Sequence, residues 1–175
     1  MSNIKRYIEE GAIYFVTSVT HKRKPIFKEE RFANLLLATI EYFKYYLEYV
    51  VYGYVVMFDH FHILIQPSEK YNISKVMNYI KGNFVRRYNE IIGRAPLRVP
   101  YPGEYSQNFN YPVWQKRFYD EIIRNEEDFY NKIEYMHNNP VKSQIVENPK
   151  DYRFSSYHQY NGVIRNTVQV AIVVP

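Results

Sequence analysis

The chain contains no cysteine among its 175 residues. This absence excludes disulfide bonds and zinc sites built from thiolates, and it is typical of a protein in a reducing cytoplasm. The sequence also lacks an apolar run near the roughly 20 residues that cross a membrane, and residues 1–6 lack the apolar core of a signal peptide. We therefore expect a cytoplasmic protein away from membranes, with one domain over residues 1–160 and a C-terminal tail over residues 161–175.

The sequence is rich in positively charged and aromatic residues. Lysine and arginine number 23 against 18 aspartates and glutamates, for a net charge of +5, and 20 tyrosines contribute to an aromatic fraction of 18%. A basic surface favours a polyanionic partner. Tyrosine rings can stack on unpaired bases, although most pack within or beside a core. The composition therefore favours a nucleic-acid partner without specifying one.

Hydrophobic periodicity predicts strands over residues 12–20, 50–57 and 61–66, and helices over residues 29–49, 72–91 and 125–139. Asn72 and Asn125 are expected to be N-cap residues, and Pro140 is expected to end the third helix because proline disfavours helical geometry in the preceding residue. Within the first strand, Ile13, Phe15, Thr17 and Val19 share one face. Residues 93–112 are predicted to form an irregular connector, residues 112–118 a short extended piece, and residues 168–174 an extended end. The order strand, helix, strand, strand, helix, helix predicts an α+β fold, an antiparallel sheet with helices on one face.

Two histidines lie two residues apart in the third predicted strand, in the segment His60-Phe61-His62. Side chains alternate along a strand, so both imidazoles project to one side, and Phe61, Ile63 and Ile65 to the other. Two imidazoles held in this way provide half of a divalent-metal site. The alternative is a pair of surface or hydrogen-bonded histidines that hold no metal.

Tyr135 stands apart from the apolar stripe of the third predicted helix, which consists of Phe129, Ile133 and Met136. It lies among polar residues, with Asn139 one turn further on. A phenol is a poor nucleophile at its ordinary pKa near ~10 and needs activation by a neighbour or by a metal-polarised substrate. Tyr135 is therefore either a candidate nucleophile or an exposed tyrosine without a chemical role.

The second helix is predicted to bury a stripe that runs from Ile73 to Ile91. The opposite face is predicted to be basic and consists of Lys75, Asn78, Gly82, Arg86 and Asn89. Glycine within a helix costs about 1 kcal/mol relative to alanine, so its presence indicates close approach of another backbone. A DNA strand could cross this face, and the alternative is a solvated basic surface. Further cations that could neutralise phosphates are found in two other segments: Lys22, Arg23, Lys116 and Arg117.

Several ordered motifs together resemble the REP-associated tyrosine transposases, the branch of the HUH superfamily related to single-strand insertion-sequence transposases. The resemblance spans nearly the whole chain. The motifs are GYVVM at 53–57, HFHILI at 60–65, SK at 74–75, KG at 81–82, WQKRFYD at 114–120, IRNEEDF at 123–129, YMHNNPVK at 135–142 and DYRFSSY at 151–157. An ordered set of this kind is far more specific than any one of its members.

The resemblance implies a ferredoxin-like antiparallel sheet with the histidine pair on a central strand and the nucleophile on a helix packed nearby. It implies that His60 and His62 hold Mg²⁺ or Mn²⁺. It also implies that Tyr135 attacks DNA and that Asn139 completes the metal site. Where the family has Pro-Asn or Pro-Glu before the first histidine, this chain has Phe-Asp, which makes Asp59 a further candidate ligand.

The activity that the resemblance implies is metal-dependent cleavage and rejoining of single-stranded DNA at hairpin-containing sites, through a covalent 5′-phosphotyrosine intermediate. The REP-associated branch favours a monomer, whereas the insertion-sequence relatives are dimers that share active sites. Two other functions remain open. A non-catalytic nucleic-acid-binding protein would keep the basic surface and could lose the metal, and a nuclease that uses water would cleave DNA without a covalent intermediate.

Overall fold

The computed structural model describes residues 11–94, 112–162 and 168–171. In chain order its elements are β1 (Tyr14–Val19), the 3-10 turns η1 (His21–Arg23) and η2 (Ile26–Lys28), α1 (Glu30–Leu47), β2 (Val50–Val56), β3 (His60–Gln66), α2 (Ile73–Ile91), β4 (Tyr119–Ile122), α3 (Glu126–Lys142), η3 (Pro149–Asp151) and α4 (Tyr157–Tyr160). Within these ranges, no helix combines the length and the apolarity that crossing a membrane requires.

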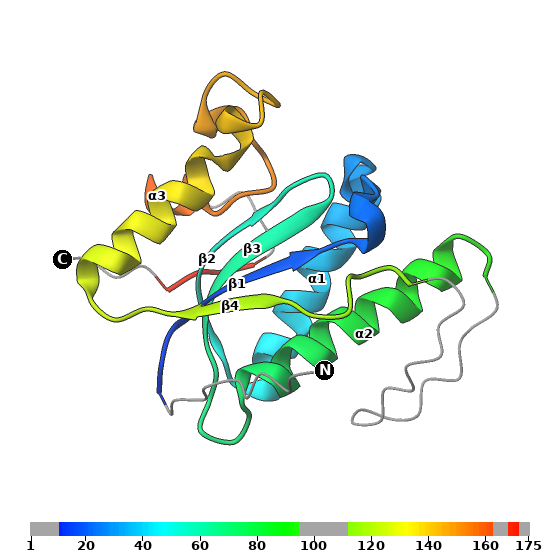
Figure 1. Ribbon diagram of the computed structural model, residues 1–175, viewed down its shortest axis with the longest axis horizontal. Helices are drawn as coiled ribbons and strands as arrows, with labels where there is room; N and C mark the ends of the chain where they lie inside the picture. Colours follow the sequence, from blue (N-terminus) through cyan, green and yellow to red (C-terminus); the bar gives the residue numbers. More distant parts are fainter. Residues whose placement is uncertain (1–10, 95–111, 163–167, 172–175) are drawn as a thin grey trace.

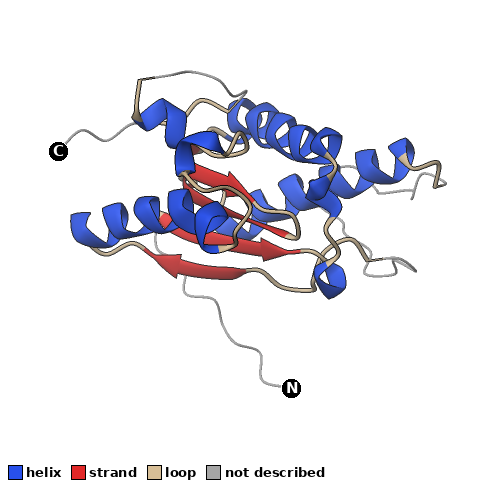
Figure 2. Ribbon diagram, turned by 90° about the horizontal axis from the view of Figure 1, so that it is seen from above, coloured by secondary structure: helices blue, strands red, loops and turns tan. Residues whose placement is uncertain are grey.

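The four strands form one antiparallel sheet in the order β2-β3-β1-β4 (Figure 1). This strand order, with α1 and α2 as the connecting helices, is ferredoxin-like and confirms the predicted α+β fold. The strand that carries the histidine pair, β3, is one of the two central strands, as predicted. Helices α1 and α2 lie on one face of the sheet and α3 lies on the other (Figures 1 and 2), so the prediction that all helices share one face was wrong.

Strand alternation separates the hydrophobic core from the face that carries polar groups. His62 pairs with Thr17 of β1, and His60 pairs with Val19, so these four side chains project to the same face. Phe61 projects to the opposite face, where it is fully buried and contacts the ring of Trp114. One face of the sheet therefore packs against α1 and α2, and the face that carries the histidines packs against α3.

Helix α3 was predicted to end near Asn139. It continues through Pro140 to Lys142 instead. Proline has no N–H to donate to the preceding turn. The helix instead ends after Lys142 in a Schellman motif, in which the left-handed Gln144 donates to the carbonyl of Val141 and Ile145 donates to the carbonyl of Pro140. Asn139 and Pro140 are both buried, so packing outweighs the local preference that the sequence prediction relied on.

Strand β4 was not predicted, since the sequence suggested only a short extended piece over 112–118. Its four residues pair with β1 at the edge of the sheet, and none of them is fully buried. An edge strand of this length lacks the apolar alternation that identifies a strand from sequence. The short helix α4 was likewise not predicted. Residues 95–111 of the predicted connector lie outside the described residues.

The two predicted N-caps are confirmed, because the Asn72 and Asn125 side chains each accept a hydrogen bond from a backbone N–H three residues later. Two residues of α2 differ from prediction. Ile91 is 47% exposed instead of buried, and Asn89 is buried instead of lying on the basic face. Both lie in the last turn, where the apolar face no longer follows the stripe of the preceding turns.

Part of the predicted tail packs on the domain. Val168 is fully buried, Gln169 accepts a hydrogen bond from Lys44 Nζ, and the Ala171 N–H donates to the carbonyl of Val51. Residues 168–171 belong to no strand, and residues 172–174 of the predicted extended end lie outside the described ranges. Residues 163–167 of the tail also lie outside them, and the domain boundary at residue 160 stays a prediction.

Candidate active site

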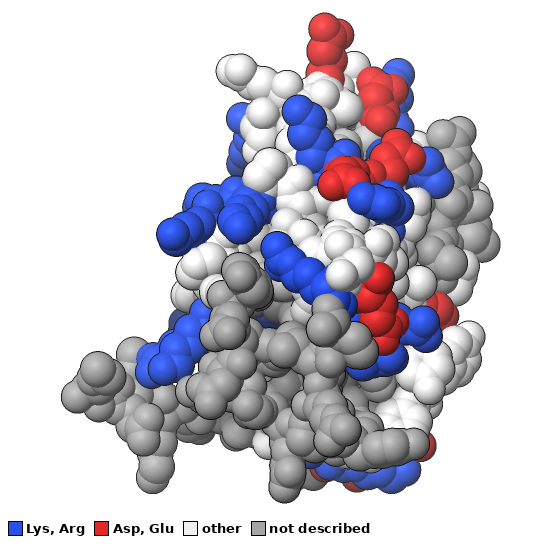
Figure 3. All heavy atoms as spheres, turned by 90° about the vertical axis from the view of Figure 1, so that its right-hand side faces the viewer, with Lys and Arg blue, Asp and Glu red and all other residues white. Residues whose placement is uncertain are grey.

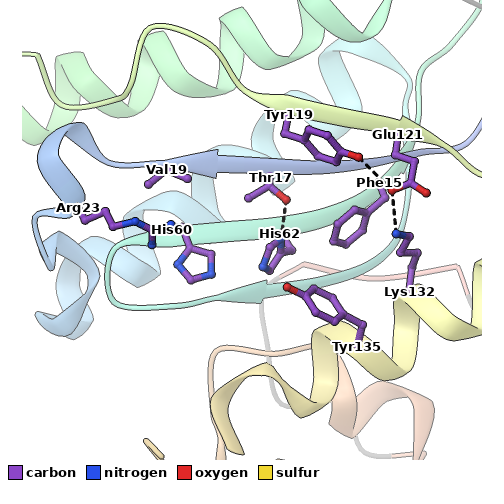
Figure 4. A pocket seen from close by; sticks show the side chains of 10 residues that line it. All are labelled: Phe15, Thr17, Val19, Arg23, His60, His62, Tyr119, Glu121, Lys132 and Tyr135. Carbon is purple, nitrogen blue, oxygen red and sulfur yellow. Dashed lines mark hydrogen bonds and ion pairs between the residues drawn. The ribbon is translucent and has the colours of Figure 1, made fainter. Parts of the chain in front are cut away.

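A cavity of about 430 Å³ opens on the histidine face of the sheet, beside α3 (Figure 4). Side chains of β1, β3, β4 and α3 line it, together with one side chain from η1. The cavity brings together four residues that the sequence analysis selected: Arg23, His60, His62 and Tyr135. They come from three segments that are far apart along the chain.

His62 is held from one side and unpartnered on the other. Its Nδ1 lies 2.7 Å from Thr17 Oγ1, and its ring stacks on Phe15 with the ring centroids 5.2 Å apart. Its Nε2 is buried and has no hydrogen-bond partner among the described residues. Burial lowers the pKa of His62 to about 3, and the charges of His60 and Lys132 contribute to this shift. The imidazole is therefore neutral, and with Nδ1 assigned as the donor to Thr17, Nε2 keeps a free lone pair.

His60 is oriented by Asp59, whose Oδ1 lies 2.5 Å from His60 Nδ1. The other oxygen of this carboxylate accepts a hydrogen bond from Arg23 at 3.0 Å. Burial alone would raise the pKa of Asp59, but the hydrogen bonds from His60 and Arg23 outweigh it and leave that pKa below its ordinary value. Both oxygens of Asp59 are thus engaged, and its side chain orients the first histidine of the pair.

Tyr135 projects from α3 toward the two imidazoles (Figure 4). Its ring centroid lies 5.5 Å from that of His62 and 6.0 Å from that of Phe15. The side chain is 41% exposed, so one side of the phenol faces the open cavity. Tyr135 therefore reaches the histidine pair because it lies off the apolar stripe of α3, as the sequence predicted.

The donor set of the cavity fits a divalent metal ion in part. Both imidazoles have Nδ1 engaged by a neighbouring side chain, as oriented metal ligands do, and the buried Nε2 of His62 is an acceptor without a partner. Asn139 lies one helical turn after Tyr135, is buried, does not line the cavity, and has an Nδ2 atom without a partner. Across the described ranges, no three His, Cys, Asp or Glu side chains converge on a point that could hold a metal. The chain thus offers two imidazoles, and the role of Asn139 stays a prediction.

The other residues expected to bind DNA are distributed over two regions. Lys22 is exposed on η1 next to Arg23, and Lys116 and Arg117 are exposed just before β4. The face formed by Lys75, Gly82 and Arg86 belongs to α2, on the other side of the sheet, and does not line the cavity. On this helix Arg86 forms an ion pair of 2.9 Å with Glu90.

Several side chains that line the cavity were not predicted from the sequence. Tyr119 and Glu121 come from β4, and the failure to predict this strand concealed them. Thr17 and Phe15 lie on the predicted face of the first strand, and only the pairing with β3 shows that this face meets the histidines. Lys132 precedes Tyr135 on α3 and forms an ion pair of 2.8 Å with Glu121, which closes one wall of the cavity.

Gly53 of β2 allows α3 to approach the sheet closely. A Cβ atom at this position would lie 2.6 Å from Ile133 Cδ1 and 2.8 Å from Met136 Cε, whereas carbon atoms in contact are separated by about 3.5–4.0 Å. Both side chains belong to the buried stripe of α3. The distance between sheet and helix that brings Tyr135 beside His62 therefore depends on the absence of a side chain at position 53.

Two known proteins are similar to this chain over most of its length. A Haemophilus influenzae protein described as a REP-associated tyrosine transposase is 28% identical over 164 residues, which cover 91% of this chain and 87% of that protein. The Escherichia coli K12 REP-associated tyrosine transposase is 26% identical over 160 residues, which cover 91% and 84% of the two chains.

Solved structures show the same fold. The structure of a REP-associated tyrosine transposase bound to a REP hairpin superposes with a TM-score of 0.72 at 23% identity, covering 99% of this chain and 95% of that one. A transposase structure from Deinococcus radiodurans superposes with a TM-score of 0.50 at 17% identity, covering 79% and 95%. The family model described as "Transposase IS200 like" matches residues 8–139, which is most of the chain. The chain belongs to this family of IS200-like transposases.

Proposed function

We propose that this protein cleaves and rejoins single-stranded DNA at hairpin-containing sites, with Tyr135 as the nucleophile and a 5′-phosphotyrosine bond as the intermediate. We also propose that Mg²⁺ or Mn²⁺ assists the reaction. The observation that carries the proposal is that Tyr135 and His62 line the same open cavity with their ring centroids 5.5 Å apart. A neutral imidazole with an unpartnered Nε2 lies where a metal ligand would be needed.

In this mechanism the phosphodiester enters the open side of the cavity and the Tyr135 oxygen attacks its phosphorus in line with the 3′ oxygen. The bond between the tyrosine oxygen and phosphorus forms as the bond from phosphorus to the 3′ oxygen breaks. The phenol proton leaves to solvent at the exposed side of Tyr135, and the departing 3′ oxygen, on the opposite side of the phosphorus, takes up a proton from solvent. A bound ion, held by Nε2 of His60 and His62, would supply positive charge to the phosphate oxygens and the leaving oxygen.

The covalent bond to Tyr135 preserves the free energy of the phosphodiester. A different 3′-hydroxyl can therefore attack the same phosphorus and displace the tyrosine, so that strands are rejoined without ATP. Nitrogen and oxygen ligands together suit Mn²⁺ at least as well as Mg²⁺, which prefers oxygen. The two imidazoles of this chain therefore make Mn²⁺ the first ion to test.

The substrate class follows from the charge of the surface and from the relatives. One of the structural relatives is bound to a REP hairpin, and we propose a DNA hairpin with a flanking single strand for this chain. Blue Lys and Arg side chains predominate on the left half of the view in Figure 3. Since one chain supplies both the histidine pair and the tyrosine, we propose a monomer as the active form.

A direct experiment uses hairpin oligonucleotides that carry a label on either side of the cut. Incubation with Mn²⁺ should give an SDS-resistant protein–DNA complex that contains the label 3′ of the cut, while the fragment 5′ of the cut is released with a free 3′-hydroxyl. Release of both labelled fragments without protein would favour the nuclease that uses water. Binding without cleavage would favour a non-catalytic nucleic-acid-binding protein.

Replacement of Gly53 by valine should separate Tyr135 from His62 without changing either residue. The added side chain overfills the space beneath α3, and we expect the free energy of unfolding to fall by about 1–3 kcal/mol and formation of the complex to slow. Gly53→Ala is the milder control, because the atoms that it meets are the flexible ends of Ile133 and Met136. Denaturation in urea and the rate of complex formation check both effects. Wild-type stability and rate in the valine variant would contradict this role for Gly53.

Charge removal distinguishes the two basic regions that the sequence predicts to bind DNA. One double variant is Lys116→Gln with Arg117→Gln near β4, and the other is Lys75→Gln with Arg86→Gln on α2. For single strands, each lost phosphate contact should reduce the salt-dependence slope of log affinity by about 0.7, and so each double variant by about 1.4. Lys70→Gln is the control, since Lys70 pairs with Glu48. An unaltered slope would remove that pair of residues from the DNA path.

A further inference from the structure

A second cavity, of about 230 Å³, lies on the other side of the η1 turn from the candidate active site. Four basic side chains contribute to its lining, and none of the described residues that line it is acidic. The basic residues are His21, Lys22, Lys24 and Arg94. Pockets for drug-sized ligands measure about 300–1,000 Å³. This cavity is smaller, so it suits a smaller chemical group with a negatively charged group attached to it.

The remaining lining is aromatic and apolar. The half-buried ring of Tyr88 contributes to the wall, and it is held in place by the rings of Phe32 and Phe84, whose centroids lie 4.7 and 5.9 Å from its own. Buried Ile26 and Val113 add apolar surface. A rigid tyrosine, an apolar floor and surrounding cations are the features with which proteins bind a base and its phosphate in single-stranded nucleic acid.

The η1 turn connects this cavity with the candidate active site. Lys22 and Arg23 both adopt left-handed backbone conformations, with φ of 54° and 52°. Within this turn, Arg23 lines the active-site cavity, whereas Lys22 and the following Lys24 line the second cavity. The buried Thr20 hydroxyl holds the turn through the carbonyl oxygens of Lys24 and Asp59, at 2.8 Å each.

We propose that the second cavity binds one unpaired nucleotide of the same DNA strand whose phosphate lies at Tyr135, and this inference rests on the proposed function. The strand passes over η1, where Arg23 faces one phosphate and Lys22 and Lys24 face the next. The base enters the cavity beside Tyr88. The cavity thereby recognises the single-stranded segment that flanks a hairpin, and it restricts which phosphate reaches the nucleophile.

The test uses Tyr135→Phe protein, which cannot cleave, and a fluorescent 12-nucleotide oligo(dT) probe together with an abasic probe of the same length. Base stacking contributes about 1–3 kcal/mol, which is about 5- to 150-fold in affinity. We therefore expect Tyr88→Leu to weaken binding of oligo(dT) by at least about fivefold and to leave binding of the abasic probe unchanged. Lys22→Gln with Lys24→Gln should weaken binding of both probes and reduce the salt slope by about 1.4.

Matched controls are Tyr45→Leu, which removes an exposed tyrosine of α1, and Lys70→Gln. Equal binding of oligo(dT) by the cavity variants and the controls would overturn the proposal. The exposed lysines can be changed without disturbing the core, so the lysine double variant decides the question even if Tyr88→Leu fails to fold. Complex formation by the wild-type protein is scored separately. A protein that forms the covalent complex but binds oligo(dT) equally in all variants refutes this inference alone.

Discussion

Tyr135→Phe is expected to abolish the SDS-resistant protein–DNA complex while DNA binding persists. Removal of the nucleophile from an enzyme that works through a covalent intermediate lowers the rate by on the order of 10⁶-fold. One lost hydroxyl changes binding far less, because a single hydrogen bond contributes about 0.5–1.5 kcal/mol. The phenol is partly exposed and contacts its neighbours through its ring, so phenylalanine fits the same position. Labelled hairpin DNA with Mn²⁺, analysed by denaturing electrophoresis, provides the measurement.

Tyr119→Phe is the matched control, since Tyr119 lines the same cavity from β4 and its hydroxyl lies 3.4 Å from Glu121 Oε2. This variant should still form the complex. Persistence of the complex in Tyr135→Phe, together with its loss in Tyr119→Phe, would assign the nucleophile to the strand instead of the helix. Persistence in both single variants would exclude both assignments.

His62→Ala should abolish cleavage even in saturating Mn²⁺, because it removes the neutral imidazole whose buried lone pair is proposed to bind the ion. Thr17→Val tests the same site without removing a ligand. The valine has nearly the shape of threonine but cannot hydrogen-bond to His62 Nδ1, and loss of a hydrogen-bond partner of a metal ligand typically costs about 10–100-fold in metal affinity. We expect the Mn²⁺ concentration at half-maximal cleavage to rise by that factor, with the maximal rate largely retained.

Manganese titration of cleavage measures both variants, with thermal denaturation to confirm that each is folded. Tyr45→Leu is the control, because Tyr45 is exposed on α1 and does not line the candidate active site, and its half-maximal Mn²⁺ concentration should match that of the wild type. Unchanged cleavage by His62→Ala would refute the assignment of His62 as a ligand. An unchanged half-maximal concentration in Thr17→Val would show that this hydrogen bond does not orient the ligand.

Much of the site could be predicted from local pattern. The alternation of β3 places His60 and His62 on one face, and the helical period of α3 places Tyr135 away from its apolar stripe. Both inferences depend only on the geometry of a single element. The motifs that resemble the REP-associated tyrosine transposases added the expectation that these two elements meet, and the distance between Tyr135 and His62 agrees with it.

The predictions that were wrong have a common physical cause. Pro140 was expected to end a helix, but the buried turn around it continues to Lys142. Strand β4 has no apolar alternation of its own and forms by pairing with β1. In each case, contacts with distant segments outweigh the preference of the local sequence, and no window of neighbouring residues contains those contacts.

Local sequence thus determined the type of most elements and which side chains share a face, because those properties follow from backbone periodicity. Tertiary structure alone decided which faces meet. Helix α3 packs on the histidine face, where Gly53 leaves space for it. Thr17 and Asp59 are the hydrogen-bond partners of the two imidazoles. The cations of η1 lie between the two cavities. These relations join residues that are distant in the chain, and their geometry depends on how the sheet and helices pack.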